Sequence, residues 1–217
     1  MKPIIGIVSR PLISESGNHI FYVNNEIKNK IVQHGAIAIS IIPSDKVMYD
    51  PSKQDLTFYD ETDSKKIIDM CSGLIFQGGD EFYGYDMQFI KYAYDKNIPT
   101  LGICLGMQIM GYFLNGKYEK IKGHFHKQKL CYVHDVILNK SSKLHEILKT
   151  DKFKVNSSHD YMITKTDLFI SGKSNDNVIE AVEDSSKRFF IGLQWHPERL
   201  DDEYSSKLFK YFIKECS

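Results

Sequence analysis

The chain has 217 residues, with 28 Lys and Arg against 28 Asp and Glu, and therefore no formal net charge. Proteins that bind mainly nucleic acid are normally clearly basic, so this balance argues against that class. Hydrophobic residues make up 42% and charged residues 26% of the chain, which excludes a wholly disordered protein and predicts one globular domain over 1–217.

The first half of the chain alternates short apolar runs with longer mixed segments. Residues 3–8 form a continuous β-branched run, typical of a strand that is buried on both faces. Residues 21–34 carry apolar side chains at four-residue spacing and precede Gly35, which predicts a helix. The same reasoning gives further strands at 36–43, 73–79 and 98–106, helices at 84–97 and 107–115, and a loop with one short helix at 44–64. This alternation predicts an α/β fold with a central, mostly parallel sheet flanked by helices.

After residue 117 the pattern changes to short alternating runs that are separated by turn signals. Such runs are typical of antiparallel strands, and the last of them is expected to return to the main sheet. The expected strands lie at 130–138, 153–159, 162–166, 168–173, 178–184 and 189–196. Residues 204–216 carry an apolar stripe at helical spacing, which predicts a final helix.

The segment GICLG, residues 102–106, is the sharpest local signal. It lies between an expected strand and an expected helix and matches the Gly-x-nucleophile-x-Gly pattern of a nucleophile elbow, with Cys104 as the nucleophile. The tight turn requires both glycines, and the N-terminus of the following helix would stabilise negative charge on the sulfur. The amide of Leu105 would then donate to an oxyanion. Alone, the pattern fits a buried cysteine between two packing glycines equally well.

The segment QWHPE, residues 194–198, is the second signal. Pro197 favours an extended conformation at His196, and residues two apart in an extended chain face the same side. Glu198 can therefore hydrogen-bond one ring nitrogen of His196, which is the orienting role in a catalytic triad. A surface His-Pro turn is the more common explanation of this segment when it is taken alone.

The segment QGGD, residues 77–80, ends an expected strand. Glycines in this position allow a backbone amide to approach a ligand closely. A plain β-turn would explain the same residues.

Together these segments resemble the class I glutamine amidotransferase-like superfamily and, within it, the γ-glutamyl hydrolases of the peptidase C26 family. The resemblance covers nearly the whole chain and is carried, in order, by PIIGIVSR, FQGGDEF, GICLGMQ, VNSSHD and FIGLQWHPE. It implies a flavodoxin-like α/β domain and a cysteine hydrolase without a cofactor. The segment FQGG departs from the LPGG that is usual in the family.

The resemblance implies a role for each matched residue. Cys104 would form a γ-glutamyl thioester, His196 would transfer protons, and Glu198 would orient His196. The backbone amides of Gly79 and Leu105 would form the oxyanion hole. The substrate contacts that the resemblance implies are Gln108, Ser157, Ser158 and His159. Arg10 is a further expected contact, because it ends the first strand, where open α/β sheets bind ligands.

The resemblance favours hydrolysis of a small-molecule γ-glutamyl amide, with water as the acceptor and glutamate as a product. The opening residues resemble the free-standing hydrolases, and we expect no synthetase domain in the chain. The alternative is a glutaminase that delivers ammonia to a separate synthetase. A binding protein with an inactive site is disfavoured because Cys104, His196 and Glu198 are all present.

The leaving group is suggested by residues 116–129, which hold five Lys and two His against one Glu. A basic rim suits an anionic leaving group such as a phosphate or a nucleotide. Among the family's substrates, this favours γ-glutamyl-CDP-amidate, which is hydrolysed during phosphoramidate decoration of bacterial capsules. A neutral amine, as in γ-glutamyl-GABA, and a merely solvated lysine face are the alternatives.

The metal, redox and partner expectations are mostly negative. His124, His126, Cys131 and His134 lie close in sequence but match no strong zinc spacing, so we expect no metal. The other cysteines, Cys71 and Cys216, form no CxxC pair, and no stretch approaches the roughly 18 apolar residues of a membrane span. We expect a cytoplasmic protein with reduced thiols and no nucleic-acid or membrane partner. The surface allows a homodimer, although no apolar stripe demands one.

Overall fold

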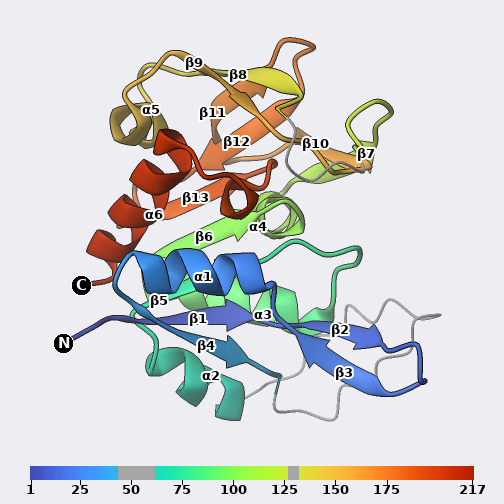
Figure 1. The fold of residues 1–217 in the computed structure, drawn as a ribbon, viewed down its shortest axis with the longest axis vertical. Coiled ribbons are helices and arrows are strands. Elements are labelled where there is room, and N and C mark those ends of the chain that lie inside the picture. Colours follow the sequence, from blue (N-terminus) through green and yellow to red (C-terminus); the bar gives the residue numbers. More distant parts are fainter. Residues whose placement is uncertain (44–61, 127–131) are drawn as a thin grey trace.

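A nine-stranded sheet forms the centre of the computed structural model, which describes residues 1–43, 62–126 and 132–217 (Figure 1). The parallel part contains β4 (Ile37–Ile41), β1 (Ile4–Val8), β5 (Gly73–Phe76), β6 (Thr100–Ile103) and β13 (Phe190–Leu193). The antiparallel part continues from β13 with β12 (Ile179–Glu183), β11 (Phe169–Ser174), β8 (His134–Leu138) and β9 (Lys152–Val155). The strands lie side by side in the order just given.

The expected α/β class is confirmed, including the mostly parallel core and the added antiparallel strands. The return of the last run to the main sheet is also confirmed, because β13 pairs in parallel with β6 and places Gly192 opposite Gly102. Strands β1, β4 and β6 point away from the side of the molecule where both termini lie (Figure 1). Their carboxyl ends therefore share one edge of the sheet.

Helices cover both faces of the sheet. The helices are α1 (Asn25–Gln33), α2 (Thr62–Asp69), α3 (Gly84–Asp95), α4 (Leu105–Phe113), α5 (Lys143–Leu148) and α6 (Glu203–Glu215), with a 3-10 turn, η1 (Pro197–Arg199). One face packs α1, α5 and α6 around a core that includes Ile5 and Phe209. The other face packs α2, α3 and α4 around a core that includes Leu74 and Met110. Among the described residues, no helix is long and apolar enough to cross a membrane.

Among the described residues, two pairs of short strands lie outside the main sheet. Strands β7 (Lys117–Lys120) and β10 (Tyr161–Lys165) form an antiparallel pair, so the strand expected at 162–166 does not join the central sheet. Helix α5, which the sequence analysis did not predict, begins after Ser142, whose hydroxyl accepts a hydrogen bond from the amide of His145 at 3.0 Å. Of the loop expected at 44–64, residues 44–61 lie outside the described residues, and α2 begins at Thr62.

The helix expected at 21–34 begins only at Asn25, and this is a correction. Residues His19–Tyr22 instead form β3, which pairs antiparallel with β2 (Arg10–Ile13). The buried side chain of Gln77 explains the boundary. Its amide nitrogen donates to the carbonyls of Val8 and Tyr22, both at 3.0 Å, and its oxygen accepts from the amide of Asn24 at 2.8 Å. A residue far away in sequence therefore holds this segment extended until α1 begins.

Replacing Gln77 by Ala should lower the free energy of unfolding by about 2–4 kcal/mol, because buried backbone groups would lose their partners. Chemical denaturation measures this change. The matched control is Gln33→Ala, an exposed glutamine at the end of α1, which should change stability by less than about 0.5 kcal/mol. Equal effects of the two substitutions would show that the Gln77 contacts do not hold the β2–β3 hairpin in place.

Candidate active site

Cys104 lies in a strained turn between β6 and α4. Its backbone has φ 54° and ψ −106°, a positive φ that a residue with a side chain rarely adopts. The flanking glycines make the turn possible. A Cβ on Gly106 would overlap the carbonyl of Phe76, and one on Gly102 would lie 2.7 Å from the carbonyl oxygen of Gly106. The turn therefore presents Cys104 at the carboxyl edge of the sheet, at the first turn of a helix.

His196 and Glu198 lie just beyond the end of the neighbouring strand β13. The Nδ1 atom of His196 lies 2.8 Å from Oε1 of Glu198, and both side chains are buried. The backbone of His196 is held on both sides by Asn156, whose amide group accepts from its N–H and donates to its carbonyl, each at 2.9 Å. The imidazole is thus fixed by a carboxylate, and its backbone is fixed by a side chain from another segment.

The structure brings the predicted triad residues together. Burial lowers the pKa of His196, but the charges of Glu198 and Cys104, together with hydrogen bonds to both, outweigh burial and raise it to about 9. Gly78 lies next to both His196 and Cys104. A Cβ on Gly78 would lie 3.1 Å from Cε1 of His196 and 3.6 Å from Cβ of Cys104, so the glycine leaves room for the two side chains. A cysteine, an imidazole and a carboxylate in this order are the constellation used for nucleophilic catalysis.

The two residues predicted to form the oxyanion hole flank Cys104. Leu105 is the first residue of α4, where a backbone N–H has no partner within the helix. Gly79 lies on the other side, and a Cβ there would lie 3.1 Å from Cδ2 of Leu105. Their catalytic role stays a prediction.

A cavity of about 210 Å³ opens at Cys104. Its walls come from the ends of β5 and β6, from α4 and from the segment before β10. The lining residues are Gly79, Asp80, Cys104, Gln108, Phe125, Ser158, His159, Asp160 and Tyr161. Three of the predicted substrate contacts, Gln108, Ser158 and His159, are therefore at the cavity wall.

Ser157 and Arg10 do not line this cavity. The hydroxyl of Ser157 is buried and donates to the carbonyl of His124 at 2.6 Å. The guanidinium of Arg10 is also buried and forms two hydrogen bonds with the carboxylate of Asp86, at 2.6 and 3.0 Å, and one with the carbonyl of Glu81. We therefore correct the expectation for Arg10. The end of a strand correctly places the residue near the site, but an internal carboxylate binds its charge.

Gln194 is a neighbour of the thiol to which the sequence analysis gave no role. Its Nε2 atom lies 3.7 Å from Sγ of Cys104, and its Oε1 atom accepts from Nε2 of Gln108 at 3.2 Å. The residue belongs to the segment QWHPE, two positions before His196. The sequence could have pointed to Gln194, because residues two positions apart in an extended chain face the same side and His196 was already a candidate.

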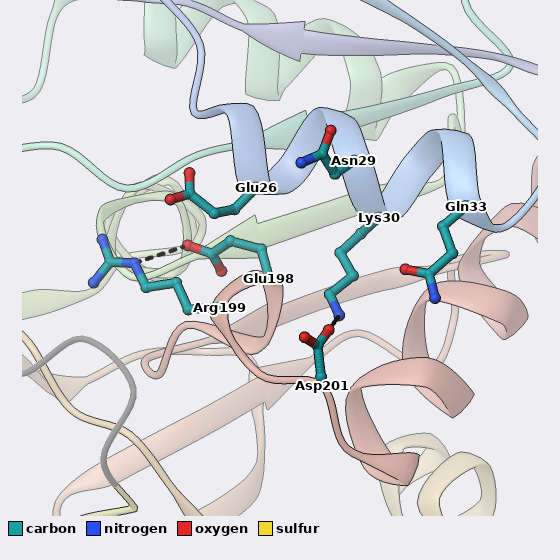
Figure 2. Close-up of a pocket in the computed structure, with 7 residues that line it drawn as sticks. All are labelled: Glu26, Asn29, Lys30, Gln33, Glu198, Arg199 and Asp201. Atoms are coloured by element: carbon teal, nitrogen blue, oxygen red, sulfur yellow. Dashed lines mark hydrogen bonds and ion pairs between the residues drawn. The ribbon is translucent and has the colours of Figure 1, made fainter.

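A second, larger cavity of about 510 Å³ lies behind Glu198 (Figure 2). The 3-10 turn and the following residues form one wall, and α1 forms the other. The lining residues are Glu26, Asn29, Lys30, Gln33, Glu198, Arg199 and Asp201. One ion pair joins the two walls, with Lys30 Nζ 2.6 Å from Asp201, and a second lies within the 3-10 turn, with Arg199 Nε 3.6 Å from Glu198. Glu198 therefore lies between His196 and a charged cavity on the far side of the triad.

Among the described residues, three side chains that could ligate a metal gather beside the first cavity. They are His124, His134 and Glu180, whose ligand atoms lie within 4.8 Å of one another. Burial opposes the ionisation of Glu180, but interactions with His134 and His159 outweigh it and lower the carboxyl pKa. His159 connects this cluster to the cavity, because it lines the cavity as well.

Comparison with known proteins gives concordant matches. The sequence model of the peptidase C26 family matches residues 83–198, a range that contains Cys104, His196 and Glu198. A glutamine amidotransferase-like protein of Rickettsia prowazekii is 27% identical over 227 residues, which cover 72% of this chain and 81% of that protein. A glutamine-hydrolysing GMP synthase of Lactobacillus johnsonii is 33% identical over 160 residues, covering 70% of this chain but only 29% of the synthase.

Solved structures share the fold. A protein described as a GMP synthase subunit from Thermoplasma acidophilum has a TM-score of 0.70 at 19% identity, covering 100% of this chain and 95% of its own. The glutaminase domain of CTP synthase from Trypanosoma brucei, with bound acivicin, also has a TM-score of 0.70 at 19% identity, covering 99% and 94%. At this identity the likeness establishes the fold of the class I glutamine amidotransferases and nothing beyond it.

Replacing Arg10 by Ala should lower the free energy of unfolding by about 3–5 kcal/mol, because the carboxylate of Asp86 would stay buried without its partner. The matched control is Lys91→Ala, which breaks the exposed pair with Asp95 and should cost no more than about 1 kcal/mol. Urea denaturation of the two variants measures the difference. A small effect at Arg10, accompanied by a raised KM, would instead restore it as a substrate contact.

Proposed function

The chain belongs to the peptidase C26 family, and we propose that it is a cysteine hydrolase that cleaves a γ-glutamyl amide bond and releases glutamate. The coarse part of this statement, a glutamine amidotransferase-type domain for carbon–nitrogen amide bonds, follows from the family. The observation that carries the rest is the position of His196. It interacts with Glu198 and with Cys104, and Cys104 lines a cavity that has Gly79 on its wall.

In the proposed mechanism, the thiolate of Cys104 attacks the γ-carbonyl carbon of the substrate. The negative charge that develops on the carbonyl oxygen is stabilised by the amides of Gly79 and Leu105. His196, whose pKa of about 9 keeps it protonated at neutral pH, donates its proton to the departing nitrogen. The amine leaves, and a γ-glutamyl thioester remains. His196 then takes a proton from water, whose oxygen attacks the thioester carbonyl; glutamate is released, and Cys104 is again a thiolate beside the protonated His196.

The glutamyl head group has suitable partners in the cavity. Asp80 and Asp160 line it and supply negative charge for an α-amino group, whereas Gln108 supplies an amide. A fixed α-amino contact would hold the γ-carbonyl in one orientation relative to Cys104, which is the positioning that effective catalysis needs.

We propose further that the leaving amine carries a phosphate or nucleotide, with γ-glutamyl-CDP-amidate of capsule phosphoramidate biosynthesis as the specific substrate. Its support is the lysine-rich segment beside the cavity, in which Lys120 Nζ lies 5.7 Å from the ring centre of Tyr161, a lining residue. Lys127 and Lys129, which belong to the same basic segment, lie outside the described residues. A positively charged rim would attract the phosphate of the leaving group, while the acidic side chains of the cavity wall bind the α-amino group of the glutamyl part.

A glutaminase that supplies ammonia to a synthetase is the second candidate. It is favoured by the similarity to proteins named as GMP synthase and CTP synthase. The two candidates share the thioester chemistry and differ in the leaving group, which is ammonia for a glutaminase and a substituted amine for a γ-glutamyl hydrolase.

Glutamate release by the purified protein from glutamine, γ-glutamyl-GABA and γ-glutamyl-CDP-amidate tests the proposal. We expect fast release from the nucleotide amidate, slower release from γ-glutamyl-GABA and little from glutamine. The Cys104→Ala variant should lose at least about 10³-fold in rate on every substrate, because the attacking atom is gone. Turnover of glutamine alone would favour the glutaminase, and an active Cys104→Ala variant would refute the thioester mechanism.

The pH profile of kcat/KM tests the coupling between His196 and Glu198. Because the pKa of His196 is raised to about 9, the imidazolium is present below that pH, and activity should fall as the pH rises through about 9. Glu198→Gln removes one of the charges that raise this pKa, so the alkaline limb should move to lower pH. Glu26→Gln, which removes an exposed carboxylate from the same second cavity, is the control and should leave the limb in place. An unshifted limb in Glu198→Gln would contradict the coupling.

A further inference from the structure

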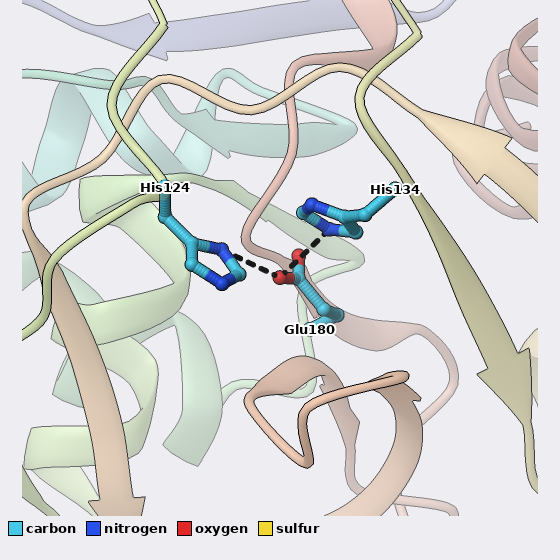
Figure 3. Close-up of side chains that lie close together, drawn as sticks. All are labelled: His124, His134 and Glu180. Atoms are coloured by element: carbon cyan, nitrogen blue, oxygen red, sulfur yellow. Dashed lines mark ion pairs between the residues drawn. The ribbon is translucent and has the colours of Figure 1, made fainter.

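Three histidines surround one buried carboxylate next to the active-site cavity. Figure 3 shows the rings of His124 and His134 approaching the carboxylate of Glu180, to which both are linked by ion pairs. The distances to Oε1 of Glu180 are 3.0 Å from Nε2 of His134, 3.6 Å from Nδ1 of His124 and 3.8 Å from Nε2 of His159. Strands β8 and β12 supply His134 and Glu180, and two loops joined by the Phe125–Ser158 bridge supply the others.

The carboxylate of Glu180 is incompletely satisfied by the protein. Glu180 is 0% exposed, and neither of its oxygens has a hydrogen-bond partner among the described residues. The same holds for Nε2 of His134, which lies close to Oε1 but not in line for an N–H···O bond. Buried polar atoms are nearly always bonded to protein, water or an ion, so these three atoms have bonding capacity that a water or an ion would satisfy.

The spacing of the donor atoms fits a small tetrahedral cation. In a zinc site with bonds of about 2.0–2.1 Å, neighbouring donor atoms lie about 3.3 Å apart. The separations from Oε1 of Glu180 are 3.0, 3.6 and 3.8 Å, and Nδ1 of His124 lies 3.2 Å from Nε2 of His159. These values lie near the expected edge. The ligand atoms of His124, His134 and Glu180 all lie within 4.8 Å of one another, so inward shifts of the side chains would bring them around one centre, with His159 beside them.

The second nitrogens of two of the rings have partners that orient them. Nε2 of His124 lies 3.0 Å from Oδ2 of Asp176, which leaves Nδ1 facing the cluster. Nδ1 of His159 lies 2.9 Å from the carbonyl oxygen of Tyr161, which leaves Nε2 facing the cluster. Ligating histidines typically donate their other N–H to a carboxylate or a backbone carbonyl, and both forms of this arrangement are present.

From these contacts we propose that His124, His134, His159 and Glu180 bind one Zn²⁺ ion or a similar divalent transition metal. Three imidazoles and a carboxylate close the coordination sphere, so the site is structural and does not activate water. The ion ties β8 and β12 to the loop that carries His159, and through it fixes one wall of the Cys104 cavity. The hydrolysis proposed above needs no metal, and this site stands independently of it.

The proposal departs from the expectation of no metal, which rests on the spacing of residues 124–134 alone. His126, which belongs to that short segment, bonds the carbonyl of Gly123 at 3.0 Å and is not part of the cluster. Cys131 lies outside the described residues. The ligands that complete the site, His159 and Glu180, come from distant segments. The competing explanation is a metal-free cluster in which one imidazolium neutralises Glu180.

Metal binding by the Cys104→Ala protein distinguishes the two, since this variant lacks the active-site thiol that would itself bind metal. After removal of metal with a chelator, Co²⁺ should bind at one ion per chain with the intense visible absorption of a four-coordinate site, and Zn²⁺ should displace it. Zn²⁺ should also raise the melting temperature of the apoprotein. Adding Glu180→Gln or His134→Asn should abolish both effects, and Asp176→Asn should weaken affinity by about 10–100-fold.

The matched control is His126→Asn, which removes a histidine of the same segment and should leave stoichiometry, spectrum and melting shift unchanged. Retained binding in Glu180→Gln, or loss in His126→Asn, would overturn the assigned ligand set, as would a sulfur-to-cobalt charge-transfer band. Failure of the unaltered cluster to bind Co²⁺ or Zn²⁺ would overturn the site and leave the imidazolium cluster. Circular dichroism of each variant establishes that it is folded before binding is measured.

Discussion

The close contact between α4 and β5 at Gly106 is the constraint on which the active site depends. Because Gly106 has no Cβ, the helix can start directly against the carbonyl of Phe76. The chain must then turn within one residue, and that residue, Cys104, takes the positive φ. The amide of Cys104 donates to the carbonyl of Leu193 at the end of β13, only three residues before His196. These two contacts, of Gly106 with Phe76 and of Cys104 with Leu193, involve only backbone atoms of β5, β13 and the turn. The backbone therefore sets how close the thiol and the imidazole can lie.

Matched burial of opposite charges is the second theme of this edge of the sheet. Glu198 faces His196, and Asp86 faces Arg10. Such pairs add little net stability over apolar packing, but removing one partner is costly because the other charge stays buried. They therefore fix geometry more than they raise stability, and an active site that must hold a cavity open needs fixed geometry.

The sequence could predict elements whose burial is set by their own pattern. Strands β1 and β13 are continuous apolar runs, and α4 follows from its glycines and its apolar face. The β2–β3 hairpin escaped prediction because the contacts of Gln77, more than fifty residues away, decide where α1 begins. Arg10 was placed correctly at the edge of the sheet, but no local pattern reveals that Asp86 binds it. The triad segments were informative because the residues that shape each one lie within a few positions of one another. The residues around Glu180 come from distant segments, so no local pattern reveals that they meet.

The two halves of the sheet divide the work of the site. The parallel half ends in Cys104 and in the segment with Gly79, so it supplies the attacking atom and the amides proposed to bind the oxyanion. The loop before β10 and β10 itself supply His159 and Tyr161, which line another wall of the cavity. The strained turn itself is set by Gly102, Gly106 and Phe76, none of which belongs to that wall. The histidine–glutamate cluster lies behind the wall that carries His159 and Tyr161. By holding this wall rigid, the cluster would help the cavity to select one substrate.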